Sequence, residues 1–390
     1  MVQVKVVVAH NRYSSAQPSG ENIVVDSEIA QLTGAGVTVV PFLRSSDEIA
    51  DLGPVGKLAL MGSPVYSRST QRELSAMLER ERPDVLHLHN PYPFLSPAVV
   101  RTAQRHGVPV VQTVHNYRQV CVNGLYFRDG HLCHDCRGRM VGLPGVLHGC
   151  YRGSKAQSAV MATALAVNRG TWRRLDRYIA LTEAVADHLR GFGVSDDRIT
   201  VKPNGVPDPG EPAPPGDGFV YVGRLSDEKG VSLLLDAWER HPDGALGRLA
   251  VAGDGPLRAA VAAAAARRGD IEYFGQVTPA ERDDLLRAAA ALVTASVCED
   301  VLPTVVIEAM AHGRPVLTTD LGGPPSMVAD TGVVVAPTVE ALADGLARMR
   351  VAAAELSGRA RQRYLSHFTP EVVLSRQLEI YRELSENGRS

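Results

Sequence analysis

Short apolar runs alternate with helical stretches along almost the whole of this 390-residue chain. The runs are rich in β-branched residues and are bounded by Gly, Pro or Asn, which is typical of buried strands. In the first half we expect a helix at 22–32 and strands at 4–9, 37–41, 84–89, 108–113, 177–181 and 199–202. This alternation predicts a parallel sheet that is covered by helices on both faces.

One segment interrupts the alternation. Residues 203–218 read PNGVPDPGEPAPPGDG and hold six Pro and four Gly, which indicates a linker. After it the pattern restarts, with strands expected at 219–222, 249–252, 271–274, 291–295, 316–319 and 333–335. The last part, from 338 to about 386, is helical and charged. The simplest interpretation is an α/β protein of two doubly wound, Rossmann-like domains.

These signals define the expected domain boundaries. We expect a first domain at 1–204 with a cysteine-rich insert at about 118–152, a linker at 205–218 and a second domain at 219–370. Residues 371–390 form a terminal helix that can cross back to the first domain. In open α/β sheets, ligands bind beyond the carboxyl ends of the strands. Two such sheets that face each other across a hinge would form a ligand-binding cleft.

Composition excludes several classes of protein. Charged residues make up 22% of the chain, hydrophobic residues 45%, and the net charge is -2, which argues against a disordered chain or a basic nucleic-acid binder. No apolar run approaches the roughly 18 residues of a membrane-spanning helix. The first residues are apolar but lack a basic leader and a cleavage site, so they predict a strand rather than a signal peptide. We therefore expect a cytoplasmic protein.

The first motif with chemical potential is GRLSDEKG at 223–230, directly after the first strand of the second domain. It leads into a helix at about Val231, and a helix amino terminus favours anions. Arg224 and Lys229 add two cations that suit a diphosphate. Alternatively, the motif is a capped loop with surface charges. The chain has only five lysines, which makes Lys229 more noticeable.

The second motif spans residues 298–316 and follows the strand at 291–295. Pro303 stands where a helix begins, so the backbone N–H groups of Thr304, Val305 and Val306 would point outward. Glu299 and Asp300 precede this turn and Glu308 lies inside the helix. Carboxylates here could accept hydrogen bonds from the hydroxyls of a sugar or a ribose. Alternatively, Asp300 is an N-cap and Glu308 a surface residue.

Histidines mark the strand ends of the first domain. His115 lies in TVHNY, just after a strand, where it can face the cleft and donate a hydrogen bond. His87 and His89 share one face of another strand, and any of these residues can instead be structural. His10 and Asn11 end the first strand and precede a polar loop, 13–21, whose Gly20 would let a phosphate or an acceptor approach the backbone.

Four of the five cysteines lie within one segment, and two of them form a C-x-x-C pair. This spacing suggests a tetrahedral structural zinc site, with neighbouring histidines as substitute ligands. Four unbound thiols or a redox pair are the alternatives, and stable disulfides are disfavoured in a cytoplasmic protein. The proposed zinc ligands are Cys121, Cys133, Cys136 and Cys150.

The stretch 151–177 places basic residues around an apolar centre. It fits an interfacial helix beside a membrane. It fits equally a buried helix with a basic end, which we favour because the net charge is unremarkable. Its basic residues are Arg152, Lys155, Arg169, Arg173, Arg174 and Arg177.

Taken together in this order, the motifs resemble those of the retaining glycosyltransferases of family 4, which share the GT-B fold. The resemblance covers nearly the whole chain: residues 10–13 and 19–21, 113–117, 202–206, 223–230, 252–256 and 301–316. The segment 121–150 also resembles a cysteine-rich insertion of a bacterial subset. Two departures stand out, because Ser19 replaces the family's first loop glycine and the first of its paired glutamates falls on Asp300, with Glu299 just before it.

The resemblance implies transfer of a sugar from a nucleotide-diphosphate donor to a hydroxyl of a glycan, a lipid-linked or a natural-product acceptor, with retention and without a divalent ion. Asp300 or Glu299 would hold the sugar, Glu308 the ribose, and His115 would contact the donor sugar. Donor-binding positions by resemblance are Gly20, Asn204, Arg224, Lys229, Gly253, Asp254, Pro303, Thr304, Val305 and Val306. The departing phosphate oxygen would take the acceptor's proton.

Two other functions remain open from the sequence. A nucleotide-sugar epimerase of the same fold would need acid and base groups that reach the sugar carbon. A two-domain sugar-binding protein without catalysis would need an export signal and would not explain Arg224 and Lys229 together.

Overall fold

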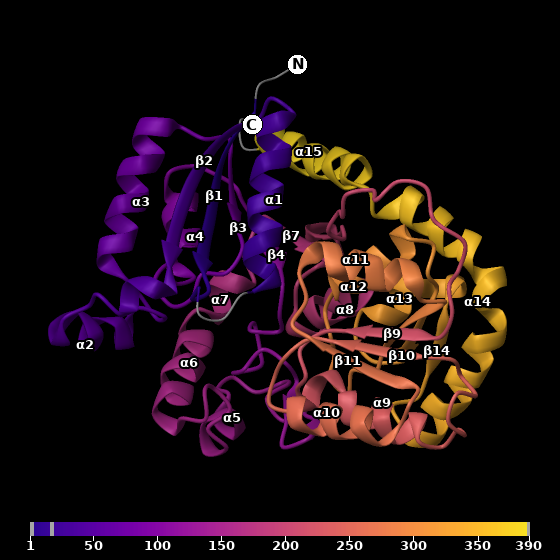
Figure 1. The fold of residues 1–390 in the computed structure, drawn as a ribbon. Coiled ribbons are helices and arrows are strands. Elements are labelled where there is room, and N and C mark those ends of the chain that lie inside the picture. The colour runs from indigo at the N-terminus through magenta and orange to yellow at the C-terminus, as the bar shows by residue number, and fades with distance from the viewer. Residues whose placement is uncertain (1–3, 16–18, 388–390) are drawn as a thin grey trace. The chain divides into compact units, whose positions relative to one another are not determined.

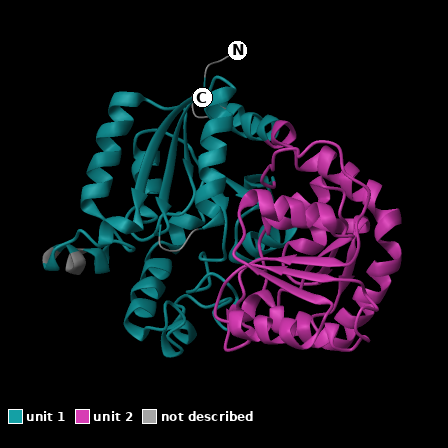
Figure 2. Ribbon diagram, viewed as in Figure 1, with its two compact units in different colours: residues 1–126, 134–202, 374–390 teal, residues 127–133, 203–373 magenta. Residues whose placement is uncertain are grey.

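The computed structural model describes residues 4–15 and 19–387. The chain divides into two compact units (Figure 2): unit 1 holds residues 1–126, 134–202 and 374–390, and unit 2 holds residues 127–133 and 203–373. Each unit is built on its own six-stranded parallel sheet. The two Rossmann-like sheets confirm the predicted α/β class.

The sheet of unit 1 has the strand order β2-β1-β3-β4-β7-β8 (Figure 1). Every strand expected there is present, with ends that differ by up to four residues. His10 and Asn11, expected at the end of the first strand, lie inside β1 because β1 stays paired with β2 as far as Arg12. The strands are β1 (Lys5–Arg12), β2 (Thr38–Ser45), β3 (Val85–Leu88), β4 (Val110–Val114), β7 (Arg177–Ala180) and β8 (Ile199–Val201).

Helices cover this sheet. Apolar residues of β1, β3, β4 and β7 form one core with α1 and with Ile380, Tyr381 and Leu384 of the last helix. That helix, α15, therefore packs on the unit 1 sheet from residue 374 onward. The helices of this part are α1 (Gly20–Gly34), α2 (Pro54–Gly62), α3 (Arg68–Glu81), α4 (Ala98–Arg105), α5 (Leu143–Leu147), α6 (Lys155–Val167), α7 (Arg169–Trp172), α8 (Glu183–Phe192) and α15 (Pro370–Asn387).

The sheet of unit 2 has the order β11-β10-β9-β12-β13-β14. Its strands fall within one residue of the expected positions, because buried parallel strands are continuous apolar runs. They are β9 (Phe219–Val222), β10 (Leu249–Ala252), β11 (Ile271–Gly275), β12 (Ala291–Thr294), β13 (Val316–Thr319) and β14 (Val333–Val335). A short hairpin of two-residue strands, β5 (Phe127–Arg128) and β6 (His131–Leu132), was not expected from the sequence.

Two hydrophobic cores flank the unit 2 sheet. One packs the strands against α9 and α14, and the other packs them against α11, α12 and α13. The expected helical region from 338 is two helices, because Pro370 begins a new helix after Phe368 and Thr369. The helices are α9 (Val231–Trp238), α10 (Arg258–Arg267), α11 (Pro279–Ala288), α12 (Thr304–Ala311), α13 (Pro324–Val328) and α14 (Val339–His367).

The Pro-rich segment 203–218 has no regular secondary structure, and its last part is held in place by the buried side chain of Arg314. The guanidinium of Arg314 is fully buried and donates to the carbonyls of Ala213 and Pro214. It also donates to the carbonyls of Leu286 and Arg287. These bonds fix the last part of the segment against the body of unit 2.

The basic stretch 151–177 contains α6, which buries Met161, Ala162 and Leu165 against unit 1. That burial agrees with the favoured alternative of a buried helix with a basic end. Among residues 4–15 and 19–387, no helix is long and apolar enough to cross a membrane.

Candidate active site

In unit 2, the loops that follow three neighbouring strands are joined by backbone hydrogen bonds. The loop after β9, residues 223–230, receives a bond from Val297 N, which donates to the carbonyl of Glu228 at 3.0 Å. In the other direction, Leu225 N donates to the carbonyl of Asp254 at 2.9 Å. The structure therefore brings together the motifs that the sequence placed at 223–230, 252–256 and 298–316.

Two glycines permit this close approach. Gly230 has φ +65° and an added Cβ would lie 1.8 Å from the carbonyl oxygen of Ala295. Gly253 has φ +141° and an added Cβ would lie 1.9 Å from the carbonyl oxygen of Gly223. Any side chain at either position collides with backbone, which explains why glycine stands at both.

The most telling contact of this loop cluster joins Lys229 to Asp300. The Lys229 ammonium donates to Asp300 Oδ2, and the two side chains are 25% and 16% exposed. Asp300 also accepts from Ser296 Oγ at 3.3 Å. Although burial disfavours the charged form, attraction to Asp300 and Cys298 raises the pKa of Lys229 above its usual value. Lys229 is therefore charged at neutral pH and has one acidic partner.

The second cation of the motif is more accessible. Arg224 Nη2 lies 2.7 Å from Glu228 Oε1, but the Arg224 side chain is 60% exposed. The hydroxyl of Tyr221 donates to the carbonyl of Arg224 at 3.1 Å and fixes the backbone beneath it. An anionic ligand can thus reach Arg224 by displacing a single ion pair, in which the arginine is exposed and Glu228 is only 14% exposed.

Helix α12 begins at the same edge of the sheet. Pro303 is its N-cap, and among the described residues no side chain caps the helix. Val306 N donates to the carbonyl of Pro303, whereas Thr304 and Val305 lie half-buried at the first positions of the helix. Amide groups at a helix start favour a negative charge.

Glu308 lies one turn further along α12 and is largely buried. Burial raises its pKa, and Arg282 of α11 lies 3.0 Å from Glu308 Oε1. The sequence analysis missed Arg282. The signal that points to it is an acid within an otherwise apolar helix, since a buried carboxylate needs a cationic or donor partner.

Asp254 and Glu299, two other expected positions, follow β10 and β12 at the same strand ends. Asp254 is exposed and its Oδ1 accepts from Gly255 N at 2.8 Å. Glu299 is half-buried beside Asp300. Asn204, just after β8 in the chain, is 6% exposed.

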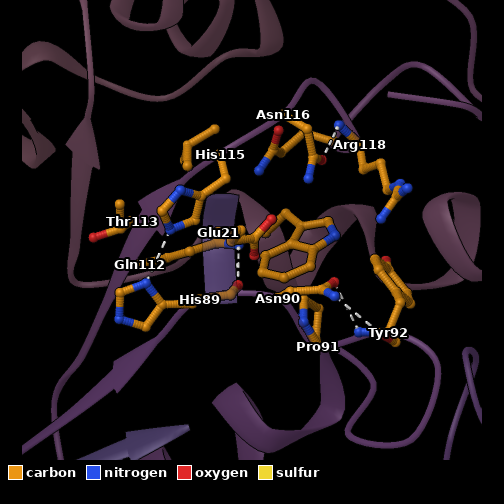
Figure 3. A pocket seen from close by; sticks show the side chains of 13 residues that line it. Glu21, His89, Asn90, Pro91, Tyr92, Gln112, Thr113, His115, Asn116 and Arg118 are labelled. Carbon is orange, nitrogen blue, oxygen red and sulfur yellow. Dashed lines mark hydrogen bonds between the residues drawn. The ribbon is translucent and has the colours of Figure 1, made fainter. Parts of the chain in front are cut away.

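In unit 1, His115 follows β4 and belongs to a chain of buried polar groups (Figure 3). His115 Nε2 lies 2.9 Å from His89 Nδ1, and His89 Nε2 lies 3.3 Å from Glu28 Oε1. His87 Nδ1 lies 3.0 Å from the same oxygen. Burial, reinforced by His89 and His10, holds the pKa of His115 well below its usual value. His115 is therefore neutral, and Glu28 of α1 is a supporting residue that the sequence analysis missed.

Beside His115 is a small polar pocket (Figure 3). Glu21 and Arg118 lie in its wall, and burial raises the pKa of Glu21 to about 7 although Arg118 lowers it. Two buried polar atoms, Gln112 Oε1 and Trp172 Nε1, have no hydrogen-bond partner among the described residues. Buried groups of this kind need a bound water or a ligand hydroxyl as a partner.

The departure at Ser19 has a local explanation. Ser19 is the N-cap of α1, and its hydroxyl accepts from Glu21 N at 3.3 Å. Gly20 is the first residue of that helix, and an added Cβ there meets nothing within 4 Å. The loop 13–21 can be followed only at its two ends, because residues 16–18 lie outside the described ranges.

In the described ranges, no three of the four insert cysteines have sulfur atoms within 4.8 Å of one another. In the described part of the chain, the group of three ligand atoms within 4.8 Å of one another is Glu28, His87 and His89. Cys121 instead donates to Asn123 Oδ1 at 3.0 Å, and burial raises the pKa of its thiol. The structure does not test the zinc hypothesis, which stays a prediction. Its ligands would be Cys121, Cys133, Cys136 and Cys150.

Comparison with known proteins assigns both halves of the chain to sugar transfer. Residues 2–205 match the family model "Glycosyl transferase 4-like domain", and residues 216–350 match "Glycosyl transferases group 1". A putative teichuronic acid biosynthesis glycosyltransferase, TuaC of Bacillus subtilis, is 26% identical over 88% of this chain and 89% of its own. The alpha-maltose-1-phosphate synthase of Mycolicibacterium smegmatis is 32% identical over 56% of this chain and 66% of its own.

Solved structures agree on the fold. A sucrose-phosphate synthase from Thermosynechococcus elongatus superposes with a TM-score of 0.71 at 20% identity, covering 98% of this chain and 99% of that one. An Anabaena protein crystallised with UDP and glucose superposes with a TM-score of 0.65 at 15% identity, covering 97% and 100%. These matches confirm the predicted GT-B fold, and the family models and relatives give the epimerase alternative no support. The chain belongs to the glycosyltransferase 4-like family and is a glycosyltransferase.

Proposed function

We propose that this glycosyltransferase moves a sugar from a nucleotide-diphosphate donor to an acceptor hydroxyl with retention of anomeric configuration. The observation that carries the proposal is Lys229, a charged and largely buried cation held at the ends of three strands beside exposed Arg224. The relatives support it, since the Anabaena structure holds UDP and glucose. The acceptor class we propose is a glycan, a lipid-linked or a small-molecule hydroxyl.

The diphosphate is the group that these cations recognise. Its oxygens would replace the carboxylates of Glu228 and Asp300 as partners of Arg224 and Lys229. The first N–H groups of α12 add further donors. Cations and amides of this kind stabilise the negative charge that builds on the leaving diphosphate.

The acidic side chains then bind the donor's hydroxyls. Asp300 is a better candidate than Glu299 for binding the sugar hydroxyls. Its carboxylate contacts Lys229, so it loses that partner and can bind the sugar when Lys229 binds the diphosphate. Glu308 would accept hydrogen bonds from the ribose hydroxyls, and Arg282 at 3.0 Å orients its carboxylate and opposes the burial that raises its pKa.

The reaction needs no enzymic base. The bond between the anomeric carbon and the phosphate oxygen breaks, and a new bond to the acceptor oxygen forms on the same face. The acceptor's proton passes to the departing phosphate oxygen, which leaves as the nucleoside diphosphate. Neutral His115 would contribute a hydrogen bond to the donor sugar rather than a charge.

The test is nucleotide release from a panel of nucleotide sugars by the wild type and Lys229→Met. Loss of one charge-assisted contact to the developing charge should lower kcat/KM by about 100-fold, with a range of 10 to 1,000. Lys5→Met is the matched control, because Lys5 also faces a carboxylate, Glu81 at 3.5 Å, with 34% and 25% exposure.

Full activity of Lys229→Met, or an equal loss in Lys5→Met, would contradict the assignment. The anomeric configuration of the product, read by NMR, decides retention independently. An altered sugar nucleotide in place of free nucleotide would indicate an epimerase.

A further inference from the structure

One long segment of unit 1 is basic without any acidic residue. Between Asp135 and Asp176 the sequence contains seven basic residues and no Asp or Glu, although the whole chain has a net charge of -2. Such a concentration of one sign of charge creates a local positive potential that the total charge conceals. The basic residues are Arg137, Arg139, Arg152, Lys155, Arg169, Arg173 and Arg174.

The same segment exposes large apolar side chains. Met140 is 80% exposed, Leu147 61% and Val167 60%, and Val141 and Leu143 are also exposed. We refer to these five residues as the apolar patch. Single exposed apolar residues are common, but several gathered on one segment usually mark an interaction site.

Two contacts connect the parts of the chain that carry the apolar patch. Helix α5, which carries Leu143 and Leu147, packs against α6, whose last residue is Val167 (Figure 1). Arg169, the first residue of α7 just after α6, donates from Nη1 at 3.3 Å to the carbonyl of Arg139, the residue before Met140. Exposed Arg139 directly precedes Met140, and exposed Lys155 is the first residue of α6, which ends at Val167.

We propose that the apolar patch and its basic surround form a docking surface for a bilayer that contains anionic phospholipids. Apolar side chains would enter the boundary between headgroups and acyl chains, and the arginines would pair with phosphates. Charge complementarity selects this partner over a second copy of the chain, because two such surfaces repel each other. The mode is peripheral, through α5 and its flanks, while α6 keeps its apolar face in unit 1.

The experiment is co-sedimentation of the full chain with vesicles, because it reads binding without any sugar transfer. One set of vesicles is pure phosphatidylcholine, and the other is equal parts phosphatidylcholine and phosphatidylglycerol. We expect binding to the anionic set alone, and a strong loss when salt rises from ~0.1 M to ~1 M, which shortens the Debye length from about 10 Å to about 3 Å.

Paired variants separate the apolar and the charged contributions. Met140→Asp and Leu147→Asp should each weaken binding about tenfold or more. Val351→Asp is their control, since Val351 is 85% exposed on α14 of unit 2. Arg139→Gln should weaken binding several-fold, and Arg240→Gln, at an exposed arginine of unit 2, should not.

Three results would overturn the proposal. One is equal binding to both kinds of vesicle, and another is a loss in Val351→Asp as large as in Met140→Asp. The third is a wild-type dimer, seen by sedimentation without lipid, that only the patch variants dissociate. Because all readouts are binding or mass, failure here is distinguishable from failure of the proposed transfer reaction.

Discussion

Glu21→Gln should remove a large pH dependence from the stability of unit 1. Glu21 lies in the wall of the pocket beside His115, with 9% of its side chain exposed. Burial raises its pKa from 4.5 to about 7, against the attraction of Arg118. The fold therefore favours the protonated carboxyl relative to the unfolded chain.

The magnitude follows from the shift. A difference of about 2.5 pKa units corresponds to about 3 kcal/mol of unfolding free energy. Because the folded pKa is raised, this stabilisation is fully present below pH 4.5 and is lost as the pH rises through 7. Gln cannot ionise, so relative to Glu21→Gln the wild type should lose roughly 2 to 3 kcal/mol between pH 5 and pH 8.

Urea unfolding at pH 5, 6, 7 and 8, followed by tryptophan fluorescence, measures this difference. Trp172 reports unit 1 and Trp238 reports unit 2, whose transition serves as an internal reference. Glu73→Gln is the matched control, since Glu73 is a half-exposed carboxylate of α3 that pairs with Arg44. Parallel pH profiles for the wild type and Glu21→Gln would refute the reasoning that burial dominates at Glu21.

Three further outcomes test unit 2 and the cysteine segment. Gly230→Ala should lower the free energy of unfolding by more than ~2 kcal/mol, because the added Cβ would meet the Ala295 carbonyl. Gly36→Ala, with φ +83° and open space around the Cβ, should lower it by only about 1 kcal/mol, and urea unfolding compares the two variants. Trp238→Phe should lower the free energy of unfolding by about 1 to 3 kcal/mol in the same assay, since Trp238 Nε1 donates a hydrogen bond to buried Asp270 at 3.1 Å. Elemental analysis should find about one zinc per chain if the insert binds metal, lost in serine variants, and a metal-free, fully active protein would exclude it. The serine variants are those of Cys121, Cys133, Cys136 and Cys150.

The strands were the most predictable part of the fold. Buried parallel strands need apolar residues on both faces, so each appears as a continuous run, as at 219–222 and 316–319. The sequence did not predict the hairpin of β5 and β6, because strands of two residues are too short to show a periodic pattern. The residue at which β1 ends was also not predicted, since it depends on the pairing of β1 with β2 and not on the residues of β1 alone.

The sequence predicted that the motifs of unit 2 meet at one edge of the sheet, but it did not predict which side chains pair there. Motifs after strands must meet at one edge of a parallel sheet, and those of unit 2 do. Which side chains pair across that edge depends on tertiary packing, as for Lys229 and Asp300, which are 71 residues apart. The same holds for Arg282 with Glu308, and for Glu28, which only the fold places beside His87 and His89.

These pairings change how the cations of the site should act. A diphosphate that recruits Arg224 replaces an ion pair whose arginine is 60% exposed although Glu228 is only 14% exposed, and it offers Arg224 a second negative charge. Recruiting Lys229 instead breaks a largely buried pair and leaves the Asp300 carboxylate in need of hydrogen-bond donors. Sugar hydroxyls can supply those donors, whereas a free nucleoside diphosphate cannot. We therefore expect Asp300 to couple the two parts of the donor, so that Asp300→Ala weakens binding of the nucleotide sugar more than binding of the nucleotide alone in calorimetric titrations. Equal losses for both ligands would contradict this coupling.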